Sequence, residues 1–310
     1  MKRFPKWLKV APIVVLVIFA GVVFIRLQLA TAEVQRDRQA LESATPLDIG
    51  ETSTLEILPL YEGAASEPGL QSGLGVSYLI KTDTATILLD VGNNPDSTSP
   101  SPLEQNMGQL GVDLDQVDMI VFSHTHFDHT GGQHWQSQGT FGIDGDVQVP
   151  LGDRPIYVPE ALAYPGSDPI VVTAPRKIAE GVATTGAIPY VYPFPAWLAI
   201  PQGVEQALVV NVKDRGIVII TGCGHMGVNS LLAHVQAEFA APVIGLVGGL
   251  HEGNASAQTL QPDLQVLQTV NPTLVAVSPH DSSPNVLAVF QQAFPGAYQA
   301  LEIGSTLEVQ

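Results

Sequence analysis

The stretch His124-Thr-His126-Phe-Asp128-His129 places four potential metal ligands within six residues of this 310-residue chain. The apolar, partly β-branched run at 119–123 predicts a buried strand directly before it, and Thr130-Gly131-Gly132 predicts a sharp turn after it. Positions i and i+2 of an extended segment point the same way, so His124 and His126 can bind one ion. Asp128 and His129 lie beyond the bend and can face a second ion. The alternative is a polar loop whose histidines only bond to neighbouring backbone groups.

Three further histidines follow apolar, strand-like runs. Ile217–Thr221 is followed by Gly222-Cys223-Gly224-His225, and we expect His225 to be a ligand. His280, after the strand Leu274–Val277, is also an expected ligand. His251 is expected to face the substrate or to support a ligand rather than to bind metal directly. Cys223 is the only cysteine, which excludes a disulfide within one chain. Whether it is a ligand or a packed small residue stays open. His134 and His234 are interpreted as structural.

The metal and partner classes follow from the side chains available. Imidazoles and a carboxylate at this density suit Zn²⁺, Mn²⁺ or Fe, and two such ions would act on a small-molecule substrate. The net charge of −17 and the pI near 4.6 argue against nucleic acid, which requires a basic face. The sequence contains no signal for the oligomeric state.

The N-terminus is predicted to be a membrane anchor or a signal peptide. Lys2, Arg3, Lys6 and Lys9 precede an apolar run at 10–25 that Arg26 closes. Ala30-Thr31-Ala32 fits a cleavage site, but the length of the apolar run favours an uncleaved anchor. Either reading places the rest of the chain outside the cytoplasm. We predict an anchor or signal at 1–32, a linker at 33–53 and one domain at 54–310.

From residue 54 onward, strand-like runs alternate with helical ones, which predicts a mixed α/β domain. The predicted helices are Val228–Phe239 and Pro284–Phe294. The predicted strands are Leu55–Leu60, Val76–Lys81, Thr86–Leu89, Met119–Ser123, Ile156–Val158, Ala207–Val212, Ile217–Thr221, Val243–Leu246 and Leu274–Val277. The loops Gly139–Pro155 and Pro189–Gln202 are expected to line the pocket.

The motif His124-x-His126-x-Asp128-His129 resembles the signature of the metallo-β-lactamase superfamily. Upstream, Leu88-Leu-Asp90-Val-Gly92 is similar to that family's Asp-x-Gly strand end, which supports the metal loop. Several further motifs look like the dihydropterin–ribofuranosylaminobenzene-phosphate synthase-like subgroup. They are Gly75–Ile80, Asn106 before Leu110–Leu114, Glu205–Leu208, Thr221–His225, Gly248–His251 and Pro279-His280.

The resemblance implies a four-layer αβ/βα sandwich with a binuclear site at one edge of its two sheets. By this likeness, His124, His126 and His225 would hold one ion, and Asp128, His129 and His280 the other. Asp128 would also orient a nucleophile, and His251 would donate to the leaving group. The family's strand commonly ends in Gly-Asp, whose carboxylate bridges the ions, but here it ends in Gly222-Cys223. A thiolate there would favour Zn²⁺.

Three functions follow as hypotheses. The first is an extracytoplasmic hydrolase of a small ester, lactone or phosphoester. The second, implied by the subgroup, is a transferase that joins a pterin to an aminobenzene ribose phosphate with loss of pyrophosphate, although export from the cytoplasm speaks against it. The third is a metal-dependent binding protein without activity, which the complete ligand set disfavours.

Overall fold

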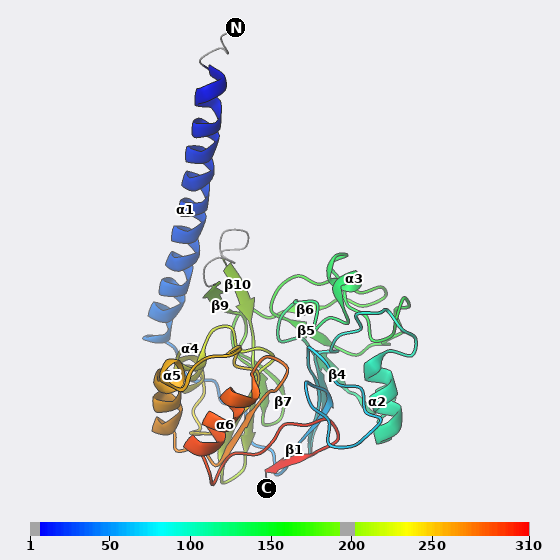
Figure 1. The fold of residues 1–310 in the computed structure, drawn as a ribbon. Helices are drawn as coiled ribbons and strands as arrows, with labels where there is room; N and C mark the ends of the chain where they lie inside the picture. Colours follow the sequence, from blue (N-terminus) through cyan, green and yellow to red (C-terminus); the bar gives the residue numbers. More distant parts are fainter. Residues whose placement is uncertain (1–6, 193–201, 310) are drawn as a thin grey trace. The chain divides into compact units, whose positions relative to one another are not determined.

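The computed structural model describes residues 7–192 and 202–309. Contacts divide the chain into two compact units, namely Met1–Ser43 with Pro189–Gly203, and Ala44–Ile188 with Val204–Gln310 (Figure 1). Lys2, Arg3 and Lys6, which belong to the predicted basic flank, lie outside the described residues, as do residues 193–201 of the predicted pocket loop Pro189–Gln202.

The first unit is dominated by one long helix, α1 (Trp7–Leu41). Its segment Ile13–Leu41 is long and apolar enough to cross a membrane, because it contains an 18-residue window with a mean hydropathy of 2.6. The apolar side chains between Ile13 and Ile25 are largely exposed, as expected for a helix without a protein core around it. The helix runs past Ala32 into the predicted linker. The domain boundaries themselves stay a prediction. Two short strands, β9 (Ile188–Val191) and β10 (Gln202–Glu205), form a separate two-stranded sheet.

The second unit contains a seven-stranded sheet in the order β15-β1-β2-β3-β4-β5-β6. The strands from β3 to β6 are parallel to one another, and the others pair antiparallel. Their bounds are β1 Leu55–Tyr61, β2 Ser77–Thr82, β3 Thr86–Leu89, β4 Met119–Val121, β5 Ile156–Val158, β6 Ile170–Val171 and β15 Leu307–Val309.

The same unit contains a six-stranded sheet in the order β14-β13-β12-β11-β8-β7. Here β12, β13 and β14 are parallel, whereas β11, β8 and β7 are antiparallel to their neighbours. Their bounds are β7 Arg176–Ala179, β8 Val182–Thr184, β11 Leu208–Val212, β12 Gly216–Ile220, β13 Val243–Gly248 and β14 Leu274–Val277.

The two sheets face each other across one apolar core. Alternate residues of each strand point inward, so Ile57 and Ile87 of one sheet share a cluster with Val210 and Val218 of the other. The opposite face of the first sheet packs on α2 (Pro102–Leu110) through residues such as Leu88. Burial on both faces explains why these strands read as continuous apolar runs.

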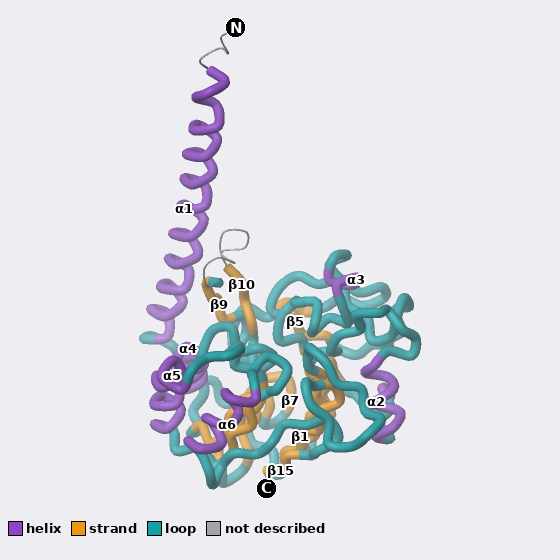
Figure 2. The backbone as a smooth tube through the Cα atoms, viewed as in Figure 1, coloured by secondary structure: helices purple, strands orange, loops and turns teal. Residues whose placement is uncertain are grey.

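The helices α4 (Val228–Glu238), α5 (Ala257–Thr269) and α6 (Pro284–Ala293) lie along the outer side of the six-stranded sheet (Figure 2). The predicted four-layer sandwich, with an apolar helix before it, is confirmed. The predicted strands and helices are all present, with small shifts at their ends. The strand before the motif ends at Val121 rather than Ser123, and α4 ends at Glu238 rather than Phe239. The elements α2, α5, α3 (Gln133–Gln136), β6, β7, β8 and β15 were not predicted.

Candidate metal centre

Five loops that follow parallel strands bring the predicted site residues to one edge of the sandwich. The loops after β3 and β4 come from the first sheet, and those after β12, β13 and β14 come from the second. The carboxyl ends of parallel strands share an edge of their sheet, which places these loops together. The structure brings together His124, His126, Asp128, His129, Cys223, His225, His251 and His280.

The first cluster contains three histidines whose rings meet edge to face. The ring centroids of His124 and His126 are 4.4 Å apart, and each lies 4.8 Å from the ring of His225. His124 Nε2 lies only 2.9 Å from His126 Nδ1. His124, Cys223 and His225 also offer donor atoms that all lie within 4.8 Å of one another.

The second cluster contains Asp128, His129, Cys223 and His280, whose donor atoms also lie within 4.8 Å of one another. His129 Nε2 is 3.0 Å from the Cys223 sulfur and 3.8 Å from Asp128 Oδ2, and His280 Nε2 is 3.3 Å from the same sulfur. All four residues are buried. Cys223 therefore lies between the two clusters, where a residue that bridges two ions would stand.

Asp90, at the end of β3, fixes the histidines of the β4 loop. Its Oδ2 accepts hydrogen bonds from Ser123 Oγ at 2.6 Å and from His129 Nδ1 at 2.7 Å, while its Oδ1 accepts from Ser123 N at 2.7 Å. Because Ser123 Oγ donates to Asp90, it accepts from His124 Nδ1 at 2.9 Å. Both rings thus use Nδ1 for support and turn Nε2 toward the cluster, as metal-binding histidines do.

Glu205 supports the β12 loop in the same way. It is fully buried and accepts four hydrogen bonds, from the backbone N–H groups of Cys223, Gly224 and His225 and from His225 Nδ1 at 2.8 Å. Burial alone would raise the pKa of this carboxyl, but the bonds from His225 and from the backbone lower it to about 2. Glu205 is therefore an anion that holds the turn and orients His225.

Glu62 plays the corresponding part for His280. Its carboxylate accepts from Tyr78 Oη at 2.5 Å, from His280 N at 3.2 Å and from the hydroxyl of Ser278, which in turn accepts from His280 Nδ1. Burial raises the pKa of Glu62 to about 7, against the lowering effect of these bonds. Sequence reasoning assigned no role to Glu62 or Glu205.

Glycine is required where two of these loops touch. A Cβ on Gly222 would lie 2.0 Å from Ser123 Oγ, and a Cβ on Gly249 would lie 2.3 Å from Gly222 O. Neither position can accommodate a side chain without moving the loops that carry the candidate metal ligands.

His251 lies beside the first cluster, with its ring centroid 4.4 Å from that of His225. Its backbone is left-handed (φ 55°), and its N–H donates to Asp281 Oδ2 at 2.8 Å. Asp281 was not predicted as a site residue, although it directly follows His280. Burial raises its pKa to about 8.

The donor atoms of the centre are better suited to binding a cation than to hydrogen bonding with one another. A neutral thiol at Cys223 has one proton, but it faces Nε2 atoms of two histidines. Burial raises the pKa of this thiol well above 9.0, whereas the pKa of His129 rises to about 9 because Asp90 and Asp128 outweigh its burial. Donors on one Zn²⁺ at a tetrahedral angle lie about 3.3–3.6 Å apart. The observed separations of 3.0, 3.3 and 3.8 Å are close to that range.

The charge balance also calls for a cation. Glu62, Asp90, Asp128 and Glu205 are buried, and the side chain of Asp281 is 5% exposed. Within the described residues, the ion pairs of these five carboxylates involve histidine alone and no Lys or Arg. Buried carboxylates are strongly unfavourable without a positive partner, so the residues present fit divalent metal ions.

Two histidines lie apart from the centre, in positions that suit structural roles. His134 is on α3, where its Nε2 lies 3.0 Å from Gln138 Nε2 and its ring packs on Trp135. His234 is buried in α4 and donates from Nδ1 to Ser230 O at 2.8 Å.

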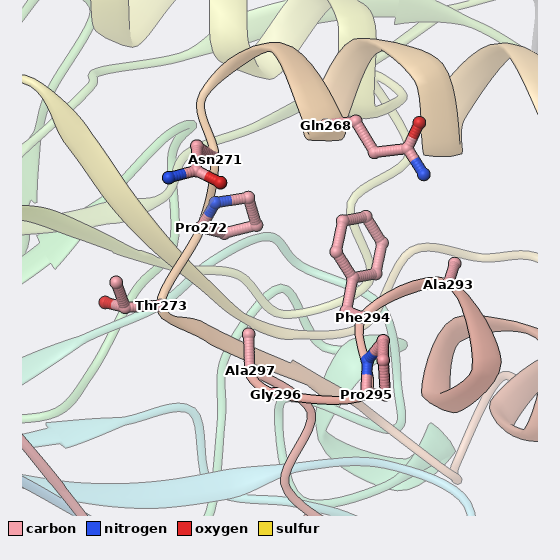
Figure 3. A pocket seen from close by; sticks show the side chains of 9 residues that line it. All are labelled: Gln268, Asn271, Pro272, Thr273, Ala293, Phe294, Pro295, Gly296 and Ala297. Atoms are coloured by element: carbon pink, nitrogen blue, oxygen red, sulfur yellow. The ribbon is translucent and has the colours of Figure 1, made fainter.

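A cavity of about 450 Å³ lies at the opposite end of β14 from His280 (Figure 3). Thr273, Phe294 and Pro295 are among its lining residues, and none of the nine has an ionisable side chain. It therefore lacks the groups that the metal centre offers for chemistry.

The comparisons with known proteins point to one family. The model of the metallo-β-lactamase superfamily matches residues 71–135. A similar protein is the 7,8-dihydropterin-6-methyl-4-(β-D-ribofuranosyl)-aminobenzene-5'-phosphate synthase of Methanocaldococcus jannaschii. It is 22% identical over 304 residues, covering 84% of this chain and 99% of that protein.

Two solved structures show the same fold. Tm1679, a metal-dependent hydrolase of the β-lactamase superfamily, superposes with a TM-score of 0.61 at 20% identity, over 83% of this chain and 99% of its own. The metallo-β-lactamase fold protein YhfI from Bacillus subtilis gives a TM-score of 0.50 at 13% identity, over 83% of this chain and 100% of its own.

Proposed function

We propose that the chain is a member of the metallo-β-lactamase superfamily and an extracytoplasmic, binuclear metal-dependent hydrolase of a small ester, lactone or phosphoester. The superfamily model that matches residues 71–135 and the shared fold support this proposal. One observation carries the proposal. Four histidines, His124, His129, His225 and His280, bond a carboxylate or a serine hydroxyl through Nδ1, which is the support that metal-binding histidines receive from their surroundings.

Two ligand sets follow. His124, His126 and His225 would hold one ion, and Asp128, His129 and His280 would hold the other. Burial, and then the charges of the neighbouring histidines, lower the pKa of His126 to about 4 and that of His124 well below 6.5. Both rings are therefore neutral near pH 7, which is the metal-binding form. Cys223 belongs to the donor groups of both sets, and as a thiolate ligand it would favour Zn²⁺ over Mn²⁺ or Fe.

The chemistry that two divalent ions supply when bound is the activation of water and the polarisation of the bond under attack. The side chain of Asp128 is 10% exposed, so one oxygen can orient the attacking group while the other binds metal. His251 is partly open to solvent and lies beside His225, where it can donate a proton to the leaving group.

The extracytoplasmic location rests on α1. Its apolar segment follows a basic flank and precedes the catalytic domain in the chain, an order that retains the positive charges inside. The length of its apolar segment supports an uncleaved anchor over a signal peptide.

A second candidate is a synthase-like transferase. It is favoured by the likeness to the M. jannaschii synthase, which extends over 99% of that protein. In this case the centre would bind the diphosphate leaving group rather than activate water. The proposed extracytoplasmic location disfavours the transferase function, because reduced pterins belong in the cytoplasm.

Activity profiling of the zinc-loaded full-length chain separates these functions. Phosphodiesters, lactones, esters and the pterin substrate pair are tested side by side, with His126→Ala as the metal-site control. Hydrolysis that is absent from the control supports the proposal. Pyrophosphate release with the pterin pair and no hydrolysis of the other substrates would replace it with the transferase.

A further inference from the structure

A third group of donor atoms adjoins the two ligand sets assigned above. Cys223, His251 and Asp281 offer a sulfur, a ring nitrogen and a carboxylate oxygen that all lie within 4.8 Å of one another. They follow β12, β13 and β14, which are adjacent parallel strands. Their proximity is therefore set by the sheet. Asp281 belongs to neither ligand set.

Asp281 is a nearly buried carboxylate that neither ligand set uses, since its side chain is only 5% exposed. Of the four carboxylates outside the two ligand sets, Asp281 accepts the fewest hydrogen bonds. It accepts one bond from His251 N at 2.8 Å and one from Ser282 Oγ at 3.1 Å, whereas Glu205 accepts four.

The backbone holds Asp281 and His251 together without using the imidazole. The left-handed His251 turns its N–H onto Asp281 Oδ2, and this oxygen lies 2.6 Å from the position of a Cβ on Gly249. Unlike the rings of His124, His129, His225 and His280, the His251 ring makes no hydrogen bond to any residue that the structure describes. Its nitrogens thus stay available to a ligand.

We propose that Cys223, His251 and Asp281 form a third divalent-cation position that fills when metal is in excess. It rests on the proposed function, because Cys223 and His251 also serve that site. Nitrogen, sulfur and carboxylate donors suit Zn²⁺. The position is weaker than the other two, since its sulfur is shared and it has only two donors of its own. An ion there takes His251 away from the leaving group, so excess zinc inhibits the enzyme.

The test counts zinc in the full-length chain in detergent, after dialysis against zinc buffers of increasing free concentration. Wild type should hold two equivalents at low free zinc and a third at higher free zinc, with activity falling at least tenfold as the third binds. Asp281→Asn keeps the shape and an oxygen for the His251 N–H but loses the charge. It should retain two equivalents and lose the third, together with the inhibition.

Two further variants complete the design. His251→Asn, at a residue exposed to solvent, should also lose the third equivalent. Ser282→Ala removes only a hydrogen bond to Asp281, so this variant should still bind the third zinc equivalent.

The outcomes are distinguishable. No third equivalent in wild type, or a third that persists in Asp281→Asn and His251→Asn, overturns the inference and marks the extra zinc as adventitious. If Asp281→Asn holds one zinc equivalent instead of two, Asp281 is a ligand of the binuclear pair. That result also overturns the inference of a third position. Fewer than two equivalents in wild type at every zinc concentration contradicts the proposed binuclear function itself.

Discussion

The Cys223 sulfur lies 3.0 Å from His129 Nε2, although the two residues are 94 positions apart and follow strands of different sheets. Cys223 is also the one residue common to every group of potential metal ligands within the described part of the chain. A thiol at such a junction is either a bridging ligand or a packed residue surrounded by ligands. The release of a proton on metal binding distinguishes the two roles, because only the thiolate form of Cys223 binds metal.

We predict that zinc affinity rises steeply with pH. Without metal, His129 has a pKa of about 9 and the pKa of Cys223 lies well above 9.0, so both carry a proton at neutral pH that an ion must displace. Raising the pH removes this competition. The logarithm of the affinity should therefore increase by about two per pH unit between pH 6 and 8, one for each proton released. Competition with a chromophoric chelator measures the slope.

The Cys223 variants identify the second proton. Cys223→Ala should lower the slope to about one and reduce zinc at Asp128, His129 and His280 more than at the other set. Cys223→Asp, which supplies a bridging carboxylate, should keep two ions and much of the activity. An unchanged slope and full occupancy in Cys223→Ala would show that Cys223 only packs.

Glu205→Gln is predicted to be destabilising although it preserves the volume of the side chain. The amide has one oxygen for four donors, and its NH₂ group must face backbone N–H groups of Cys223 and Gly224 or the His225 donors. Leaving at least two buried donors unsatisfied costs about 3 kcal/mol or more. Denaturant unfolding of the metal-free variant measures this loss. Glu67→Gln, at an exposed position, is the control and should unfold as wild type does.

The histidines of the centre could be predicted because each signal is local. An apolar run fully buried between helices and a second sheet is recognisable from a few residues, and a ligand just after it must lie at the sheet edge. His225 follows Ile217–Thr221 and His280 follows Leu274–Val277 in this way. Convergence then follows from parallel pairing, which brings the ends of β12, β13 and β14 to one edge.

The supporting acids Glu62 and Glu205 could not be predicted in this way, because their contacts are distant in sequence. Glu62 is 216 residues from Ser278, and nothing local to either residue indicates that they meet. Glu205 had a weak signal, since it is an acidic residue two positions before the largely apolar run at 207–212, where an unpaired charge would not be buried. Helix α5 was not predicted from the sequence because Pro262, a residue that usually breaks helices, lies within its first two turns.

His126→Ala should lose zinc and activity together. His126 Nδ1 faces His124 Nε2 at 2.9 Å, and its removal leaves the first set with two imidazoles. Wild-type protein should contain about two zinc ions per chain and the variant about one after dialysis against a weak chelator. Elemental analysis measures the number of zinc ions per chain in both proteins. His134→Ala, which removes an imidazole from α3 instead, is the matched control and should keep both ions.

The orientation of the chain gives the last prediction. The basic residues before α1 should remain in the cytoplasm, so a reporter enzyme that is active only outside it, fused after residue 310, should be active. A cytoplasm-only reporter at the same junction should be silent. Its activity would reverse the orientation and favour the transferase, since reduced pterins would then be on the same side as the catalytic domain. The mass of the purified chain tests the anchor separately. An intact N-terminus agrees with the continuous helix through Ala30-Thr31-Ala32, whereas a chain that begins at Glu33 would mean that this segment is a cleaved signal peptide.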